Sequence, residues 1–183
     1  MGTLRDALVA ALSLDTFNRH AEKVDMANIA QLVNNLHSLF LADGDNFVAT
    51  PTFHVYTLYR PHQGAQAVRL DVQAPDVSFR AGGGPQRIFR LAGSASRSGL
   101  KDVTLTLVHT HATEPAEVRI HLNGGAAEQV RHSVLTSEQL NAHNTFEQPD
   151  TVRPKTSLTT LRGPELRCTL PPASVNCFEI RLA

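Results

Sequence analysis

Residues 103–108 read Val-Thr-Leu-Thr-Leu-Val, so every second side chain in this stretch is apolar. Because successive side chains of a strand point to opposite faces, this alternation predicts a β-strand with one apolar face. The same alternation recurs in the second half of the chain, at residues 68–72, 118–122 and 175–182. Glycine and proline clusters separate these stretches. We therefore expect an antiparallel β-sandwich, jelly-roll-like, over residues 65–183.

The first part of the chain, residues 1–64, has a helical character instead. Thr3 and Asp6 have the spacing of a capping box, and the leucines behind them predict a helix that ends near His20. The hydroxyl of Thr50, followed directly by a proline, predicts the start of a second helix.

The stretch between these two helices is expected to contain a buried strand. Residues 24–33 (VDMANIAQLV) form a nearly continuous apolar run, typical of a strand in a parallel sheet, and periodicity leaves a helix open as the alternative. The next apolar side chains, from Leu32 to Phe40, fall on one helical face, and residues 43–46 (DGDN) predict a turn. Helix, strand and helix make one α/β unit, whose strand needs neighbours to form a sheet.

The composition argues against several classes of function. The chain has 17 Lys and Arg against 17 Asp and Glu, so it lacks the basic excess typical of nucleic-acid binding. Aromatic residues make up 5% with no tryptophan, which is poor equipment for stacking on sugars. No stretch reads as a signal peptide or approaches the roughly 18 apolar residues of a membrane span, which predicts a cytoplasmic protein. Cys168 and Cys177 are expected to be reduced core residues.

Three stretches and a closing motif resemble a known family. The stretches are residues 6–20 running into 25–34 (DMANIAQLVN), 50–55 (TPTFHV) and 135–146 (LTSEQLNAHNTF), and the closing motif is 170–175 (LPPASV). Together they resemble the C-terminal part of the α-L-arabinofuranosidases of glycoside hydrolase family 51, and the resemblance extends over nearly the whole chain.

This resemblance implies a (β/α)8 barrel followed by a C-terminal β-sandwich. Residues 1–64 would be a C-terminal remnant of the barrel, with its last helices and eighth strand, and residues 65–183 would be the sandwich. The family hydrolyses terminal α-L-arabinofuranosyl groups with retention, and we expect no cofactor or metal ion in this chain. Its two catalytic glutamates lie on earlier barrel strands, so no catalytic residue is expected among the eight glutamates of this chain: Glu22, Glu114, Glu117, Glu128, Glu138, Glu147, Glu165 and Glu179.

The resemblance implies one substrate-binding residue in this chain. Gln31 stands where the family has a glutamine that points from the eighth strand into the pocket and hydrogen-bonds the arabinose ring. An amide is suited to this role because it offers both a donor and an acceptor to sugar hydroxyls. The carboxyl end of a barrel strand is also where functional side chains usually lie.

Other polar patterns have simpler interpretations. His109 and His111 could converge on one metal ion, but no third ligand has matching spacing, so we interpret them as histidines on a solvated strand face. The amides of residues 141–145 (NAHNT) are interpreted as hydrogen-bonding the backbone of a long loop.

Two further patterns are interpreted as turns. Residues 82–84 (GGG) lack the lysine of a phosphate-binding loop. Ser94, Ser96 and Ser98 lack the sequence around a nucleophilic serine.

The sequence therefore predicts the C-terminal portion of an α-L-arabinofuranosidase that is inactive by itself. The alternative is a noncatalytic β-sandwich that packs on a partner chain or binds carbohydrate. Without the rest of a barrel, the first part should be held less firmly than the sandwich and should expose an apolar patch. We therefore expect a homo-oligomer assembled through the N-terminal segment, with these patch residues: Leu4, Leu8, Leu12, Ile29, Leu32, Leu36 and Phe40.

Overall fold

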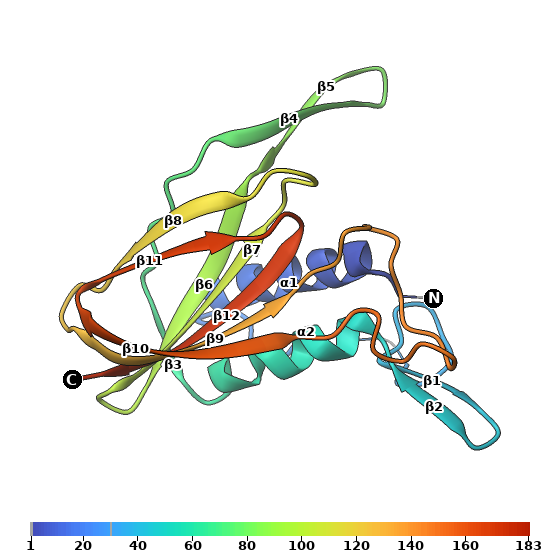
Figure 1. Cartoon of the computed structure of the whole chain (residues 1–183), viewed down its shortest axis with the longest axis horizontal. Helices are drawn as coiled ribbons and strands as arrows, with labels where there is room; N and C mark the ends of the chain where they lie inside the picture. Colours follow the sequence, from blue (N-terminus) through green and yellow to red (C-terminus); the bar gives the residue numbers. More distant parts are fainter. Residues whose placement is uncertain (1, 30) are drawn as a thin grey trace.

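In the computed structural model, which describes residues 2–29 and 31–183, a central antiparallel sheet is covered on both faces (Figure 1). Its six strands lie in the order β10, β9, β12, β7, β6, β3. In that order the strands span Lys155–Gly163, Ala127–Leu135, Ser174–Leu182, Asp102–His109, Leu91–Ser98 and Gln66–Val68. The predicted mainly β, antiparallel fold class is confirmed.

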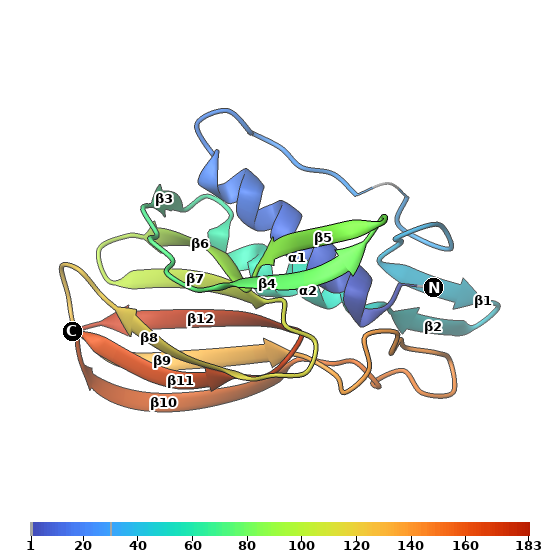
Figure 2. The same ribbon diagram turned by 90° about the horizontal axis from the view of Figure 1, so that it is seen from above.

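Two helices cover one face of this sheet and a pair of strands covers the other (Figure 2). The helices are α1 (Leu4–Arg19) and α2 (Pro51–Tyr59), and a 3-10 turn, η1 (Arg60–His62), continues α2. The covering strands are β8 (Ala116–His121) and β11 (Glu165–Leu170), which pair with each other.

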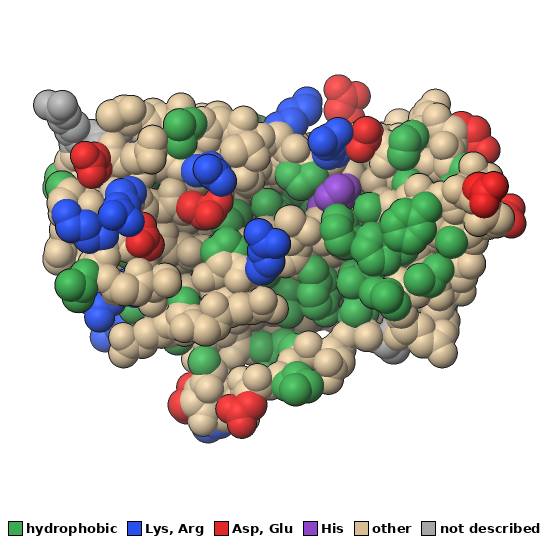
Figure 3. Space-filling view, turned by 90° about the horizontal axis from the view of Figure 1, so that it is seen from below, with side chains coloured by type: hydrophobic (Ala, Val, Ile, Leu, Met, Phe, Trp, Pro, Cys, Tyr) green, Lys and Arg blue, Asp and Glu red, His purple; other side chains and the backbone are tan. Residues whose placement is uncertain are grey.

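Two hairpins extend from this body. One consists of β4 (Asp76–Ala81) and β5 (Gly84–Phe89), and the other of β1 (Phe40–Asp43) and β2 (Asn46–Ala49). The β1–β2 hairpin lies beside the N-terminal end of α2, where hydrophobic side chains gather on the face shown in Figure 3. Here Phe40 stacks against Phe47, with ring centroids 4.7 Å apart, and also contacts Phe53 at 4.8 Å.

The side chains of β7 alternate between the two apolar cores on either side of the sheet. Leu105 and Leu107 belong to the apolar core under β8 and β11, whereas Val108 belongs to the core under the helices. Thr106 points to the helix side and is fully buried. The predicted strand is confirmed, and its hydroxyl-bearing face is covered by protein because α1 lies over it.

Both predicted helix starts are confirmed. Thr3 caps α1 through a capping box, in which the amide of Thr3 donates to Asp6 Oδ2 at 2.8 Å. Thr50 caps α2 by accepting a hydrogen bond from the Phe53 amide. Residues 44–45 form the turn between β1 and β2, as the sequence predicted.

The strand predicted over residues 24–33 is wrong for this structure. Among its described residues only Val33 takes part in a bridge, an isolated parallel one to Phe40. Ala30 lies outside the described residues. A strand is defined by hydrogen bonds to a neighbouring strand, and among the described residues no strand pairs with residues 24–29.

The helix predicted from Leu32 to Phe40 is also wrong. The amides of Leu39 and Phe40 both donate to the carbonyl of Leu32, which folds the segment into a compact loop. Asn34 stabilises this loop: it has a φ of 54°, and its side-chain amide donates to the carbonyl of Ala42 and accepts from its amide. Asparagine side chains compete in this way with helical hydrogen bonds.

Two smaller expectations need correction. Of the strand predicted over residues 68–72, only Val68 lies in a strand, because the chain leaves the sheet after β3. The apolar face of α1 is covered, since Leu4 and Leu8 are buried in one core with Val108 and Val175 of the sheet. The structure therefore removes the reason to expect a loosely held first helix.

Gly93 in β6 lies where the sheet leaves no room for a side chain. A Cβ atom at this position would lie 2.2 Å from the carbonyl oxygen of Thr106 and 2.8 Å from a methyl carbon of Leu107. We expect Gly93→Ala to lower the free energy of unfolding by about 3 kcal/mol, the upper range for overpacking, as measured by urea denaturation. Gly84→Ala is the matched control, because a Cβ atom there has no neighbour within 4 Å. Equal stability of the two variants would contradict this packing.

Candidate functional site

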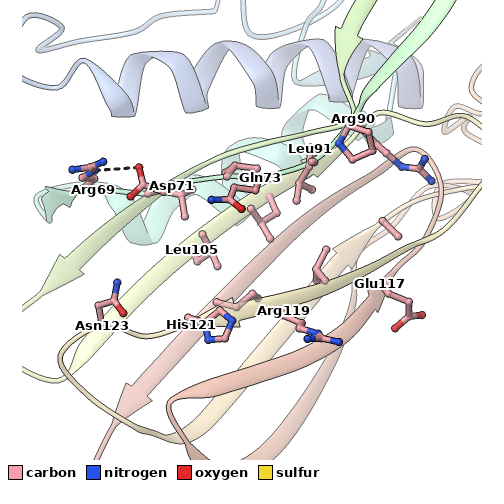
Figure 4. Close-up of a pocket in the computed structure, with 18 of the residues that line it drawn as sticks. Arg69, Asp71, Gln73, Arg90, Leu91, Leu105, Glu117, Arg119, His121 and Asn123 are labelled. Atoms are coloured by element: carbon pink, nitrogen blue, oxygen red, sulfur yellow. Dashed lines mark hydrogen bonds and ion pairs between the residues drawn. The ribbon is translucent and has the colours of Figure 1, made fainter.

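A groove of about 720 Å³ runs between β8 and the segment that follows β3. Its floor is aliphatic, formed by Leu91 and Leu105 of the sheet together with Val118 and Ile120 of β8. Figure 4 shows Leu91 and Leu105 between residues 69–75 and β8.

The rim of the groove carries charges that are largely paired. Arg69 Nε donates to Asp71 Oδ1 at 3.1 Å, and Arg90 donates to Glu114 Oε2 at 3.0 Å. Of the residues described along its walls, none is Phe, Tyr or Trp. The groove therefore lacks the rings on which proteins commonly stack sugars. Among the described strands, β8 pairs only with β11, so its other edge faces the groove.

Gln31, the predicted substrate-binding residue, lies outside any strand. Its φ is 54° and its side chain is exposed. The residue next to it, Leu32, is tied to the base of the β1–β2 hairpin through its carbonyl. Gln31 thus lies at the edge of the loop that Asn34 stabilises. The β1–β2 hairpin to which this loop is bonded lies away from β8 (Figure 1).

Three of the glutamates contact polar side chains at the surface. Glu165 contacts Arg167 and His121, Glu117 accepts from Thr169, and Glu179 lies 3.8 Å from Arg131. In the part of the chain that the structure describes, the fully buried carboxylate is that of Asp15, which belongs to α1 and contacts Ser94 and Thr106 of the sheet.

His109 and His111 do not share a ligand position. His109 is fully buried, which corrects the prediction of a solvated face; burial lowers its pKa, and its Nδ1 donates to the carbonyl of Pro171 at 2.8 Å. His111 Nδ1 accepts from the amide of Glu114 at 2.9 Å. Within residues 2–29 and 31–183 no group of three or more His, Cys, Asp or Glu side chains could hold a metal ion.

The interpretation of residues 141–145 as a loop with backbone-bonding amides is confirmed at Asn144. This side chain is buried, donates to the carbonyls of Ala49 and Val152, and accepts from the amide of Val152 at 2.7 Å. It joins the loop after β9 to the end of β2.

The turn predicted at the three serines of residues 94–98 is wrong. Ser94, Ser96 and Ser98 lie within β6, and the first two are buried beneath the helices. The two cysteines are free, as expected. Burial raises the pKa of Cys168 to about 11 and that of Cys177 to about 12, so neither thiol ionises readily.

Comparison with known proteins decides the family. Residues 1–174 match the family model described as the α-L-arabinofuranosidase C-terminal domain. The chain belongs to this family. It is also 35% identical, over 83% of its length, to an intracellular exo-α-L-arabinofuranosidase of Bacteroides ovatus. The family predicted from the sequence motifs is thereby confirmed.

Solved structures show that the whole arrangement is shared. The family 51 arabinofuranosidase of Xanthomonas axonopodis pv. citri is 36% identical, and the match covers 98% of this chain with a TM-score of 0.89. The α-L-arabinofuranosidase of Thermotoga maritima, solved as an arabinose complex, is 25% identical with a TM-score of 0.86. The chain spans 29% of the Bacteroides relative, 36% of the Xanthomonas chain and 39% of the Thermotoga chain.

No helix within the described ranges is long and apolar enough to cross a membrane.

Proposed function

We propose that this chain is the C-terminal portion of a glycosidase that removes terminal α-L-arabinofuranosyl residues from arabinose-containing oligosaccharides with retention. The observation that supports this most strongly is the match of nearly the whole chain, helices included, to family 51 arabinofuranosidases. The relatives named intracellular favour the cytoplasm as its compartment and L-arabinose metabolism as its context.

Within that enzyme, residues 1–64 would be the end of a (β/α)8 barrel and residues 65–183 the β-sandwich. The irregular stretch after α1 supports this proposal, because Met26, Leu32 and Leu36 expose apolar side chains that neighbouring barrel strands would cover. Pairing with such strands would draw residues 24–33 into a strand. Gln31 would then lie at the carboxyl end of that strand, where its amide could hydrogen-bond the arabinose ring.

The chain alone is proposed to be inactive. Hydrolysis with retention needs two carboxyl groups about 5–5.5 Å apart, on either side of the scissile bond. The glutamates described here are exposed or paired with arginines, and Asp15 is enclosed between helix and sheet.

We expect no hydrolysis of 4-nitrophenyl α-L-arabinofuranoside by the purified 183-residue chain at high concentration. An intact family 51 arabinofuranosidase in the same assay is the positive control. Release of 4-nitrophenol that scales with the chain, and that is lost on replacing one of its own carboxylates, would contradict the proposal.

The alternative role, a noncatalytic sugar-binding sandwich, is tested with the same protein. Adding arabino-oligosaccharides should leave the backbone amide NMR signals of Leu105 and Ile120 unchanged, because the groove lacks stacking rings. Saturable shifts of these signals would favour the sugar-binding role over the proposed one.

We propose that the isolated chain forms a homo-oligomer through its N-terminal segment. Leu4 and Leu8 are buried between α1 and the sheet, so they are not part of the exposed patch. Other apolar side chains of this segment are exposed: Val9, Phe17, Met26, Leu32, Leu36 and Phe47. Exposed apolar surface of this kind promotes association.

Leu36→Lys should weaken this association by about tenfold or more in sedimentation equilibrium, because the side chain is 81% exposed at the centre of the segment. Leu100→Lys is the matched control, since Leu100 is 84% exposed in the distant turn between β6 and β7. A monomeric wild-type chain at tens of micromolar would contradict the proposal, as would equal weakening by both substitutions.

A further inference from the structure

A row of buried, hydrogen-bonded polar side chains crosses the junction between the helices and the sheet. Asp15 comes from α1, His62 from η1 at the end of α2, Ser96 from β6 and Thr106 from β7. Asp15 and Thr106 are fully buried, and Ser96 and His62 are nearly so. Two helical segments and two neighbouring strands of the sheet therefore meet through side chains that carry hydrogen-bonding groups.

Each hydrogen bond in this row of side chains has a defined donor and acceptor. An ionised carboxylate only accepts, so Thr106 Oγ1 donates to Asp15 Oδ1 at 2.7 Å. Thr106 Oγ1 then accepts from His62 Nε2, which lies 3.2 Å away. His62 Nδ1 is left to accept from Ser96 Oγ at 2.7 Å. This pattern requires a neutral imidazole with its proton on Nε2.

The carboxylate of Asp15 is held by hydroxyl groups. Ser94 Oγ also donates to Asp15 Oδ1 at 2.7 Å, and Asn18 donates to Ser94 Oγ at 3.1 Å. Asp15 Oδ2 has no partner among the described residues. The guanidinium of Arg19 is nearby but donates to the carbonyl of Gly93 at 2.8 Å.

We propose that Ser96, His62, Thr106 and Asp15 form one buried relay that joins the helices to the sheet and keeps this junction stable when the surroundings become acidic. The relay contains one acid and one base, both enclosed by the same layers. The other titratable groups facing it are Arg19 and Tyr59 from the helices and Cys177 from β12.

The acid and the base respond to pH with opposite signs. Burial raises the pKa of Asp15 to about 6, so folding favours its protonated form and gains stability as the pH falls through 6. Burial lowers the pKa of His62 to about 4, so folding favours its neutral form and loses stability as the pH falls below 6.5. The gain at Asp15 offsets the loss at His62 over the same pH range.

Removing one partner should expose the response of the other. Between pH 7 and pH 4, the folding equilibrium constant of Asp15→Asn should fall on the order of 50-fold more than that of the wild type, measured by urea denaturation of the full chain. That of His62→Gln should rise on the order of 100-fold relative to the wild type. The double variant should follow the wild type within about threefold.

An exposed group provides the matched control. Asp25→Asn replaces an exposed side chain and should follow the wild-type pH dependence closely. Single variants at Asp15 and His62 that shift in the same direction, or that parallel the control, would overturn the relay.

A measurement on the unmodified protein tests the relay even if the variants fail to fold. Long-range ¹H–¹⁵N NMR correlation should show the His62 ring protonated at Nε2 and unprotonated at Nδ1, and the ring should stay neutral at pH 5 because burial lowers its pKa to about 4. Protonation of Nδ1 in the neutral ring, or a doubly protonated His62 ring at pH 5, would show that the relay does not exist.

Discussion

The carboxylate of Asp15, held at 2.7 Å by the hydroxyls of Ser94 and Thr106, joins the two layers on which the rest of the structure depends. α1 lies over one face of the central sheet at β6 and β7, while β8, β11 and the groove lie over the other face. Hydroxyl groups buried in this way are costly unless they are hydrogen-bonded. Asp15 satisfies two of them at once, and the apolar face of α1 supplies the remaining contacts.

The sequence predicted those elements whose signals are local. The capping residues Thr3 and Thr50 each begin a helix as expected, and the alternation at residues 103–108 marks a strand. The strand predicted over residues 24–33 is absent because a strand depends on neighbouring strands that the described part of the chain does not supply. The helix predicted over residues 32–40 is absent because the side chain of Asn34 hydrogen-bonds the backbone of Ala42. The periodicity of apolar residues cannot reveal such a bond.

The polar junction was missed although the sequence carried a signal for it. Leu4, Leu8, Ala11 and Asp15 follow at intervals of three and four, so an acid lies on the apolar face of a helix. The threonines of β7 were predicted as strand residues, whereas the serines of β6 were interpreted as a turn. Neither set was recognised as partners of Asp15, since their pairing with α1 is long-range. For Gln31 the family resemblance gave a role, whereas the residues described here leave its side chain exposed.

Native-state hydrogen exchange tests most directly whether the helices and the sheet unfold as one unit. The amides of residues 8–15 in α1 should exchange with the same opening free energy as those of residues 104–108 in β7, since both stretches share one core and the Asp15 junction. Exchange of the α1 amides through an opening of lower free energy, while β7 stays protected, would contradict the single cooperative unit.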